Sequence, residues 1–167
     1  MNELKFLSYC HDEHYGIVCE LFKAYFDELF INDFEINLSE ADVHEIIGFV
    51  EKAILEDNNH LYLCTKNLEY IGFCNWQIDR EETSWWKKED GWGFIGEFYI
   101  KPVFRNCGYG KMLYEFVEKK LSEAGIKKIY LTTCEKTGKA FFEKMGYTNS
   151  GEKTVNNGDE IYFKNME

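Results

Sequence analysis

A short glycine-rich segment in the second half of the chain has the residues best suited to hold an anion. It consists of Arg105, Asn106, Cys107, Gly108, Tyr109, Gly110 and Lys111. Glycines let the backbone approach a bulky anion because no Cβ stands in the way. A helix that begins at such a turn presents backbone N–H groups and the positive end of its dipole. A plain glycine turn before a surface helix is the alternative, and the segment by itself leaves both interpretations open.

Charge is distributed unevenly around this segment. Residues 1–97 carry 7 basic and 21 acidic residues, a net charge of −14, whereas residues 98–167 carry 12 basic and 9 acidic residues, a net charge of +3. Residues 101–111 contain no acid. The total of −11 argues against a nucleic-acid or anionic-membrane partner. One half of the chain therefore suits a cation and the other accommodates an anion.

Hydrophobic spacing and turn residues predict the elements that position the segment. The apolar run 93–100 predicts a strand that ends before Pro102, and residues 108–124 predict a helix stopped by Gly125. The other predicted elements are strand 4–9, helix 15–29, a helix capped by Ser39 and reaching 54, strands 61–64 and 70–78 joined near Asn67, strand 128–133, helix 138–145 and two strands joined at Asn157–Gly158. The order β-α-α-β-β-β-α-β-α-β-β predicts a mixed sheet with helices on it.

Length and composition bound the class of protein. The 167 residues, 45% of them hydrophobic, suffice for one ordinary domain over residues 1–167. No apolar run approaches the roughly 18 residues of a membrane span, and the N-terminus shows no export signal. We therefore expect a cytoplasmic protein without a membrane partner. The six cysteines contain no Cys-x-x-Cys pair and the four histidines add no ligand spacing, so no metal site is predicted.

The glycine-rich segment gains specificity from its neighbours. A strand with the sequence Gly96-Glu97-Phe98-Tyr99-Ile100-Lys101-Pro102, followed by Arg-x-x-Gly-x-Gly and a helix, resembles the Gcn5-related N-acetyltransferase (GNAT) superfamily. Residues 141–147, Phe-Phe-Glu-Lys-Met-Gly-Tyr, resemble that family's second signature. The order of elements matches the family fold over nearly the whole chain. The resemblance implies an α/β (α+β) fold with a mixed, mostly antiparallel sheet of six to seven strands flanked by about four helices.

The resemblance implies an acetyl-CoA-dependent N-acetyltransferase, with acetyl-CoA as co-substrate. The backbone of Phe98, Tyr99 and Ile100 would pair with the pantetheine arm, and the N–H groups of residues 106–111 would hold the pyrophosphate. A β-bulge would separate this strand from the strand at 128–133 and open a slot for the thioester. Amine attack on a thioester builds an oxyanion, which a fixed backbone N–H stabilises.

The resemblance also implies a catalytic role for Glu97. An alkyl amine is protonated at neutral pH and must lose a proton before it attacks. In the family an acidic residue on this strand often accepts that proton, directly or through water. Whether Glu97 is the base or anchors the substrate ammonium stays open. Family members often carry a tyrosine at the position of Phe142, which we place in the cofactor site. Without that hydroxyl, Tyr147, Tyr130, water or an unassisted thiolate would have to replace the usual general acid.

Acidic and aromatic residues favour a cationic acceptor. Residues 27–45 carry seven acids and no base, and the family places the connection between its first two helices beside the acceptor pocket. Residues 79–92 add five acids and three tryptophans. Carboxylates and aromatic faces bind amines through charge pairing and cation–π contact. The residues we expect to contact an aminoglycoside- or polyamine-like amine are Asp33, Glu35, Trp85 and Glu97. Solvated surface acids are the alternative for most of the acidic residues.

Two other functions fit the same residues. A protein or peptide N-acetyltransferase would present a wide acidic trough, whereas an enzyme for small molecules would have a closed aromatic pocket. A non-catalytic acyl-CoA-binding sensor is the other interpretation, because Phe142 lacks the hydroxyl. Trp85 and Trp86 suit a pocket or a homodimer contact equally well. The sequence leaves the acceptor and the oligomeric state open.

Overall fold

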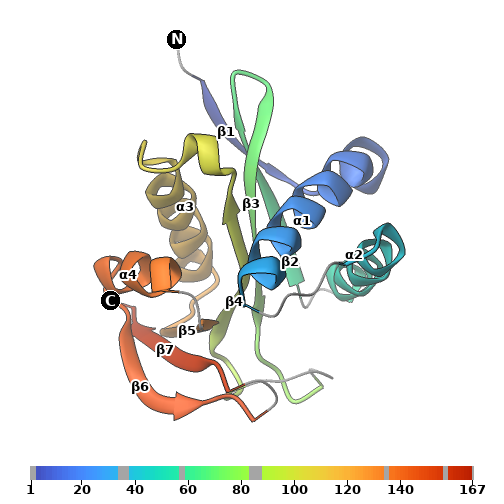
Figure 1. Ribbon diagram of the computed structural model, residues 1–167. Coiled ribbons are helices and arrows are strands. Elements are labelled where there is room, and N and C mark those ends of the chain that lie inside the picture. Colours follow the sequence, from blue (N-terminus) through green and yellow to red (C-terminus); the bar gives the residue numbers. More distant parts are fainter. Residues whose placement is uncertain are drawn as a thin grey trace. The chain divides into compact units, whose positions relative to one another are not determined.

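The computed structural model of the chain describes residues 3–33, 38–56, 59–82, 88–133, 136–155 and 158–166. Its elements are β1 (Leu4–Ser8), α1 (His11–Asp33), α2 (Glu40–Leu55), β2 (Asn59–Lys66), β3 (Glu69–Ile78), β4 (Gly93–Ile100), the 3-10 helix η1 (Pro102–Phe104), α3 (Tyr109–Glu123), β5 (Lys128–Thr133), α4 (Lys136–Lys144), β6 (Thr148–Lys153) and β7 (Glu160–Asn165), as labelled in Figure 1. Across these described residues seven strands form one sheet in the order β1-β2-β3-β4-β5-β7-β6. The predicted fold class and order of elements are confirmed.

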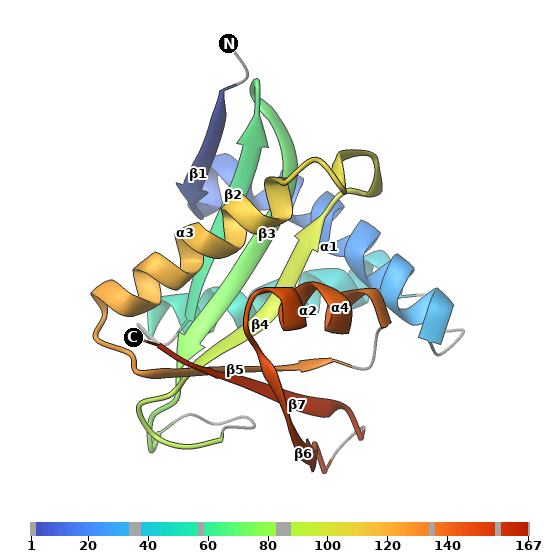
Figure 2. The ribbon, with the colours of Figure 1, turned by 90° about the vertical axis from the view of Figure 1, so that its left-hand side faces the viewer.

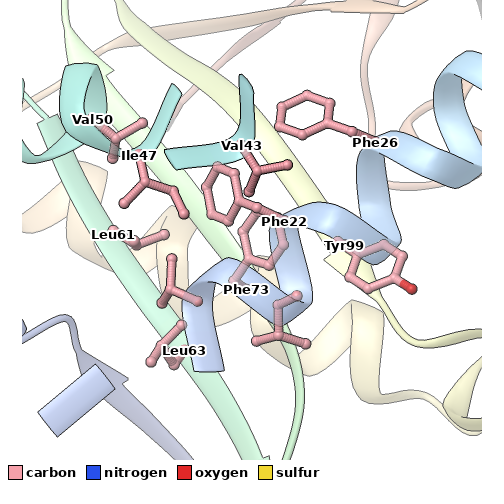
Figure 3. Close-up of a cluster of buried hydrophobic side chains, with 11 residues drawn as sticks. Phe22, Phe26, Val43, Ile47, Val50, Leu61, Leu63, Phe73 and Tyr99 are labelled. Atoms are coloured by element: carbon pink, nitrogen blue, oxygen red, sulfur yellow. The ribbon is translucent and has the colours of Figure 1, made fainter. Parts of the chain in front are cut away.

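Contacts divide the chain into two compact units, of which the first comprises residues 1–75 and 97–113. In this unit β1 pairs antiparallel with β2, and α1 and α2 cover one face of β2 and β3 (Figure 1). Apolar side chains recur along the inner faces of both helices and meet the strands in one cluster (Figure 3). Its buried members are Val18, Leu21, Phe22, Phe26, Val43, Ile47, Val50, Leu61, Leu63, Phe73 and Tyr99.

The second unit comprises residues 76–96 and 114–167. Antiparallel pairing joins β5 to β7 over the full length of both strands, and β6 pairs antiparallel with β7 (Figure 2). β4 pairs in parallel with β5 at its first two residues, beginning with Gly93 opposite Ile129. This parallel pair makes the sheet mixed, as predicted. Buried apolar and aromatic side chains of this unit include Tyr114, Val117, Leu121, Ile126, Ile129, Tyr130, Leu131, Phe142, Tyr147, Ile161 and Tyr162.

Polar side chains define where the first two helices begin. At α2, Ser39 Oγ accepts from the Asp42 N–H and the Asp42 carboxylate accepts from the Ser39 N–H, which is a capping box. α1 begins at His11, earlier than the predicted Tyr15. The reason is that the first turn is polar, with His14 Nδ1 accepting the Cys10 N–H at 2.9 Å, and hydrophobic spacing does not detect such a turn. Within the described residues, no helix combines the length and apolarity needed to cross a bilayer.

Candidate active site

The glycine-rich segment forms the connection from β4 to α3, within the first unit. β4 ends at Ile100, because Pro102 follows and begins a 3-10 turn. Asn106 and Gly108 then adopt left-handed backbone conformations, with φ of 59° and 86°. A Cβ on Gly108 would meet no atom within 4 Å, so glycine is favoured there by the backbone conformation, and the space around it is open.

The start of α3 carries backbone donors that have no acceptor inside the helix. Its first internal bond runs from the Met112 N–H to the Gly108 carbonyl at 3.1 Å. The N–H groups of Tyr109 and Gly110 therefore precede the bonding pattern of the helix. Residues 106–108 and Lys111 are exposed. Together the N–H groups, the helix dipole and the Lys111 cation have the chemistry that a phosphate-containing anion requires.

Arg105 ties the same loop to α1. Its Nη1 and Nη2 atoms donate to the two carboxylate oxygens of Glu28 at 2.6 and 2.8 Å, and its Nε donates to the Ile100 carbonyl at 2.8 Å. The guanidinium also lies over the Tyr99 ring, 5.6 Å from its centroid. The Arg105 charge is therefore paired with a carboxylate of α1, a contact that the sequence pattern does not indicate.

Lys66 adds a cation at the start of α3. Its Nζ lies 5.0 Å from the ring centroid of Tyr109 and 5.6 Å from that of Phe104. A hydrogen bond with the Tyr109 side chain raises the pKa of Lys66. Lys66 ends β2, far from the loop in sequence, so no motif links the two segments. The contact holds the first residue of α3 against the β2 strand end.

Glu97 lies on β4 and is held by two other elements of the first unit. From α1, the Tyr25 hydroxyl donates a hydrogen bond to Glu97 Oε2. From β3, Asn75 Oδ1 accepts the backbone N–H of Glu97 at 2.5 Å. Burial raises the pKa of the Glu97 carboxyl, and the hydrogen bond from Tyr25 acts in the opposite direction. A carboxyl whose pKa is moved toward neutrality is suited to take a proton from an amine.

The predicted cofactor residues fall in both units. Phe98, Tyr99 and Ile100 form the end of β4 in the first unit, directly before the loop. Phe142 lies on α4 in the second unit, where it is 8% exposed. Its ring stands 6.3 Å from the Tyr114 ring, centroid to centroid, and nearly perpendicular to it. Phe142 is therefore part of an aromatic core within its own unit.

The predicted acceptor residues are described in part. Glu35, Trp85 and the Asp33 side chain lie outside the described residues, whereas Glu97 occupies the place given above. Several other acids of the segment 27–45 have partners within the chain, which makes their charges structural. These pairs are Asp27 with Lys23, Glu28 with Arg105 and Asp42 with Ser39.

In the segment 79–92 the first acid is also structural. The Asp79 side chain accepts the Tyr130 hydroxyl and the Lys88 backbone N–H, each at 2.7 Å, and the residue has no exposed surface. Burial and the bond to Asp79 raise the pKa of Tyr130. The Tyr130 proton is thus already donated, which argues against Tyr130 as a general acid. Trp92 is covered by Lys128, whose Nζ lies 4.1 Å from a ring centroid.

Known structures share this arrangement of elements. An acetyltransferase from Thermus thermophilus is similar with a TM-score of 0.77 at 14% identity, covering 99% of this chain and 100% of that chain. The PaiA N-acetyltransferase from Thermoplasma acidophilum, in complex with coenzyme A, is similar with a TM-score of 0.74 at 15% identity, covering 98% and 99%. The ribosomal-protein-S18-alanine N-acetyltransferase from Escherichia coli is similar with a TM-score of 0.64 at 12% identity, covering 99% and 95%.

At these identities the likeness to solved structures is one of fold. No curated protein matches the sequence. Residues 20–147 match the acetyltransferase (GNAT) family, and this range includes Glu97, the loop at 105–111 and the second signature at 141–147. Because the match spans most of the chain and every motif on which the resemblance depends, the chain belongs to the acetyltransferase (GNAT) family.

Proposed function

We propose that this acetyltransferase moves the acetyl group of acetyl-CoA onto a primary amine of a cationic small molecule, of the aminoglycoside or polyamine kind. The observation that carries the proposal is a partly buried carboxylate, Glu97, on the strand that leads into an open glycine-rich loop. Family membership makes acetyl the group transferred. The complex of the similar PaiA N-acetyltransferase with coenzyme A supports coenzyme A as its carrier.

The residues of the loop fit a pyrophosphate. The N–H groups of residues 106–111 would hold its oxygens, and Lys111 would add positive charge. The backbone of residues 98–100 would pair with the pantetheine arm in the manner of an added strand. Acetyl-CoA supplies the activated acetyl group as a thioester. The left-handed Asn106 and Gly108 keep this backbone free of helix geometry, so it can curve around an anion.

Glu97 would prepare the acceptor. An ammonium nitrogen has no lone pair for attack, so one N–H proton must move to the carboxylate of Glu97, directly or through water. Because its pKa is raised, the Glu97 carboxylate holds a proton more tightly than an exposed glutamate does. Its proton affinity is therefore closer to that of the amine. The neutral amine then attacks the thioester carbonyl. The C–N bond forms and the C–S bond breaks, the nitrogen loses its second proton, and the departing thiolate takes up a proton to leave as the thiol.

Charge supports a cationic acceptor. Residues 1–97 carry a net charge of −14, from 7 bases and 21 acids, and the acids near the α1–α2 connection that lack internal partners among the described residues include the exposed Glu40 and Glu45. Asp33, Glu35 and Trp85 complete the set that we expect to meet the amine. A peptide N-terminus or lysine is the competing acceptor, and an acyl-CoA sensor the competing function.

An amine panel tests the proposal. Binding of acetyl-CoA is first confirmed by calorimetry, and thiol release is then followed with polyamines, aminoglycosides, amino acids and basic peptides. We expect polyamines or aminoglycosides to give the highest kcat/KM. Stimulation by basic peptides alone would reassign the acceptor, and tight binding of acetyl-CoA with no turnover on any amine would favour the sensor.

Glu97→Gln is the matched variant for the chemical step. It preserves shape but cannot take the proton, so we expect kcat to fall by about 10²–10⁴-fold while the acetyl-CoA affinity changes by less than about twofold. Glu20→Gln, an exposed acid of α1, is the control for the change in net charge. A Glu97→Gln enzyme with native kcat would refute the role of Glu97 as a base.

A further inference from the structure

The side chain of Glu97 has a partner on α1 that lies far away in sequence. Tyr25 precedes Glu97 by 72 positions, and its hydroxyl donates to Glu97 Oε2. Among the described residues no second hydrogen bond reaches the Glu97 carboxyl, so Oε1 has no protein donor there. One oxygen of the carboxylate is therefore held, and the other accepts no hydrogen bond from a described residue.

The phenol of Tyr25 is itself fixed by packing. Its ring stands perpendicular to Phe73, with centroids 5.7 Å apart, and lies 5.6 Å from Tyr99 and 4.9 Å from Phe26. These three rings belong to the buried cluster of the first unit, drawn in Figure 3. A side chain held on several sides loses little further freedom when its hydroxyl makes a hydrogen bond.

We propose that Tyr25 is a positioning residue of acetyl transfer, whose hydroxyl orients the Glu97 carboxylate and keeps it ionised so that Oε1 can take the proton of the amine. The proposal rests on the proposed function of Glu97. In this step an N–H bond of the ammonium breaks and an O–H bond forms at Oε1, and the nitrogen recovers its lone pair. Tyr25 keeps its own proton and donates to Oε2 before and after the transfer.

The hydrogen bond from Tyr25 opposes the effect of burial on the pKa of Glu97. Burial raises the pKa of Glu97, and the donor hydrogen bond from Tyr25 lowers it. Among the described residues, Cys74 interacts electrostatically with Glu97, and Tyr99, which packs against Tyr25, interacts with Glu28 and Arg105. Burial, and then the charge of Glu97, raise the pKa of the Cys74 thiol, so that group stays neutral. The Arg105 and Glu28 charges pair with each other beside the Tyr99 ring.

Tyr25→Phe removes the hydroxyl and keeps the ring packing. A donor bond to a partly buried charge is worth about one to two pKa units, so the pKa of Glu97 should rise by that amount. The catalytic base must be ionised, so the acidic limb of kcat/KM against pH should move up by the same one to two units. The native and variant profiles should converge at high pH. A merely structural role would instead lower kcat/KM equally at every pH.

A direct titration separates failure of this inference from failure of the proposed function. The Glu97 carboxyl is followed by 13C NMR or infrared spectroscopy in the protein without substrates, where no turnover is needed. Tyr15→Phe is the control, because it removes a phenol hydroxyl of α1 that contacts His44 at 2.7 Å and leaves Glu97 untouched. We expect the upward shift in Tyr25→Phe and none in Tyr15→Phe. An unchanged Glu97 titration in Tyr25→Phe, or an equal shift in both variants, would overturn the inference.

Discussion

Replacing Glu28 with glutamine distinguishes two roles for Arg105. If Arg105 acts as an anchor that holds the loop to α1, Glu28→Gln loosens the loop and weakens the binding of acetyl-CoA. If Arg105 instead acts by placing its charge on the pyrophosphate, the same change releases the guanidinium from a competing carboxylate. Binding would then be unchanged or tighter. The sign of the effect therefore decides between the two roles.

The structure sets the size of the expected effect. The pair makes two hydrogen bonds of 2.6 and 2.8 Å, but the Arg105 and Glu28 side chains are 37% and 32% exposed. Water therefore screens the charges, and the value of the pair is about 1 kcal/mol rather than that of a buried bidentate contact. Glutamine keeps one acceptor oxygen and loses the charge. We expect the Kd for acetyl-CoA to rise by about fivefold.

Calorimetric titration with acetyl-CoA at low and moderate salt measures this effect. Glu20→Gln is the matched control, since it removes the same charge from an exposed site on the same helix and should leave the Kd within about twofold. The rise in Kd caused by Glu28→Gln should become smaller as salt rises, because salt already weakens the Arg105–Glu28 ion pair in the native protein. An unchanged or lower Kd in Glu28→Gln would refute the anchoring role and support direct phosphate binding by Arg105.

Two further predictions concern stability. A Cβ on Gly72 of β3 would lie 2.2 Å from the Tyr99 carbonyl oxygen, so Gly72→Ala should lower the free energy of unfolding in urea by about 1–3 kcal/mol. Gly48→Ala, whose Cβ meets nothing within 4 Å on α2, should raise it by about 0.5–1 kcal/mol, and equal effects of the two changes would contradict the close approach of β3 and β4. The hydrogen bond that His11 donates to the Glu51 carboxylate raises the pKa of His11 above its ordinary value of 6.5, so this pair stabilises the fold below that value and loses its contribution as pH rises through the raised pKa. The difference in melting temperature between the native protein and His11→Gln should therefore shrink as the pH rises above the ordinary histidine pKa, and a constant difference would exclude titration of His11 as its source.

The order of elements and the position of the glycine-rich loop could be read from the sequence because both depend on local signals. Glycine, proline and capping residues act over a few positions, and hydrophobic spacing reports which face of a helix is buried. The strand before Pro102, the capping box at Ser39 and the family signature at 141–147 are signals of this kind. The first turn of α1 was not predicted, because it is polar and its hydrogen bond to His14 adds no apolar residues to the helical spacing.

The tertiary structure decided which charges and hydroxyls meet. Arg105 pairs with Glu28 across 77 positions of sequence and Glu97 with Tyr25 across 72, and no local pattern encodes contacts at such separations. Counting acids showed that the first part of the chain is negative, but only packing showed that Glu28 and Asp79 are already bound within the protein. A charged residue in a sequence could bind a ligand, and the fold determines whether it is already paired with another residue of the protein. For this acetyltransferase, the local motifs located the loop at 105–111 and Glu97, and the packing of α1 against β4 supplied Glu28 and Tyr25 as their partners.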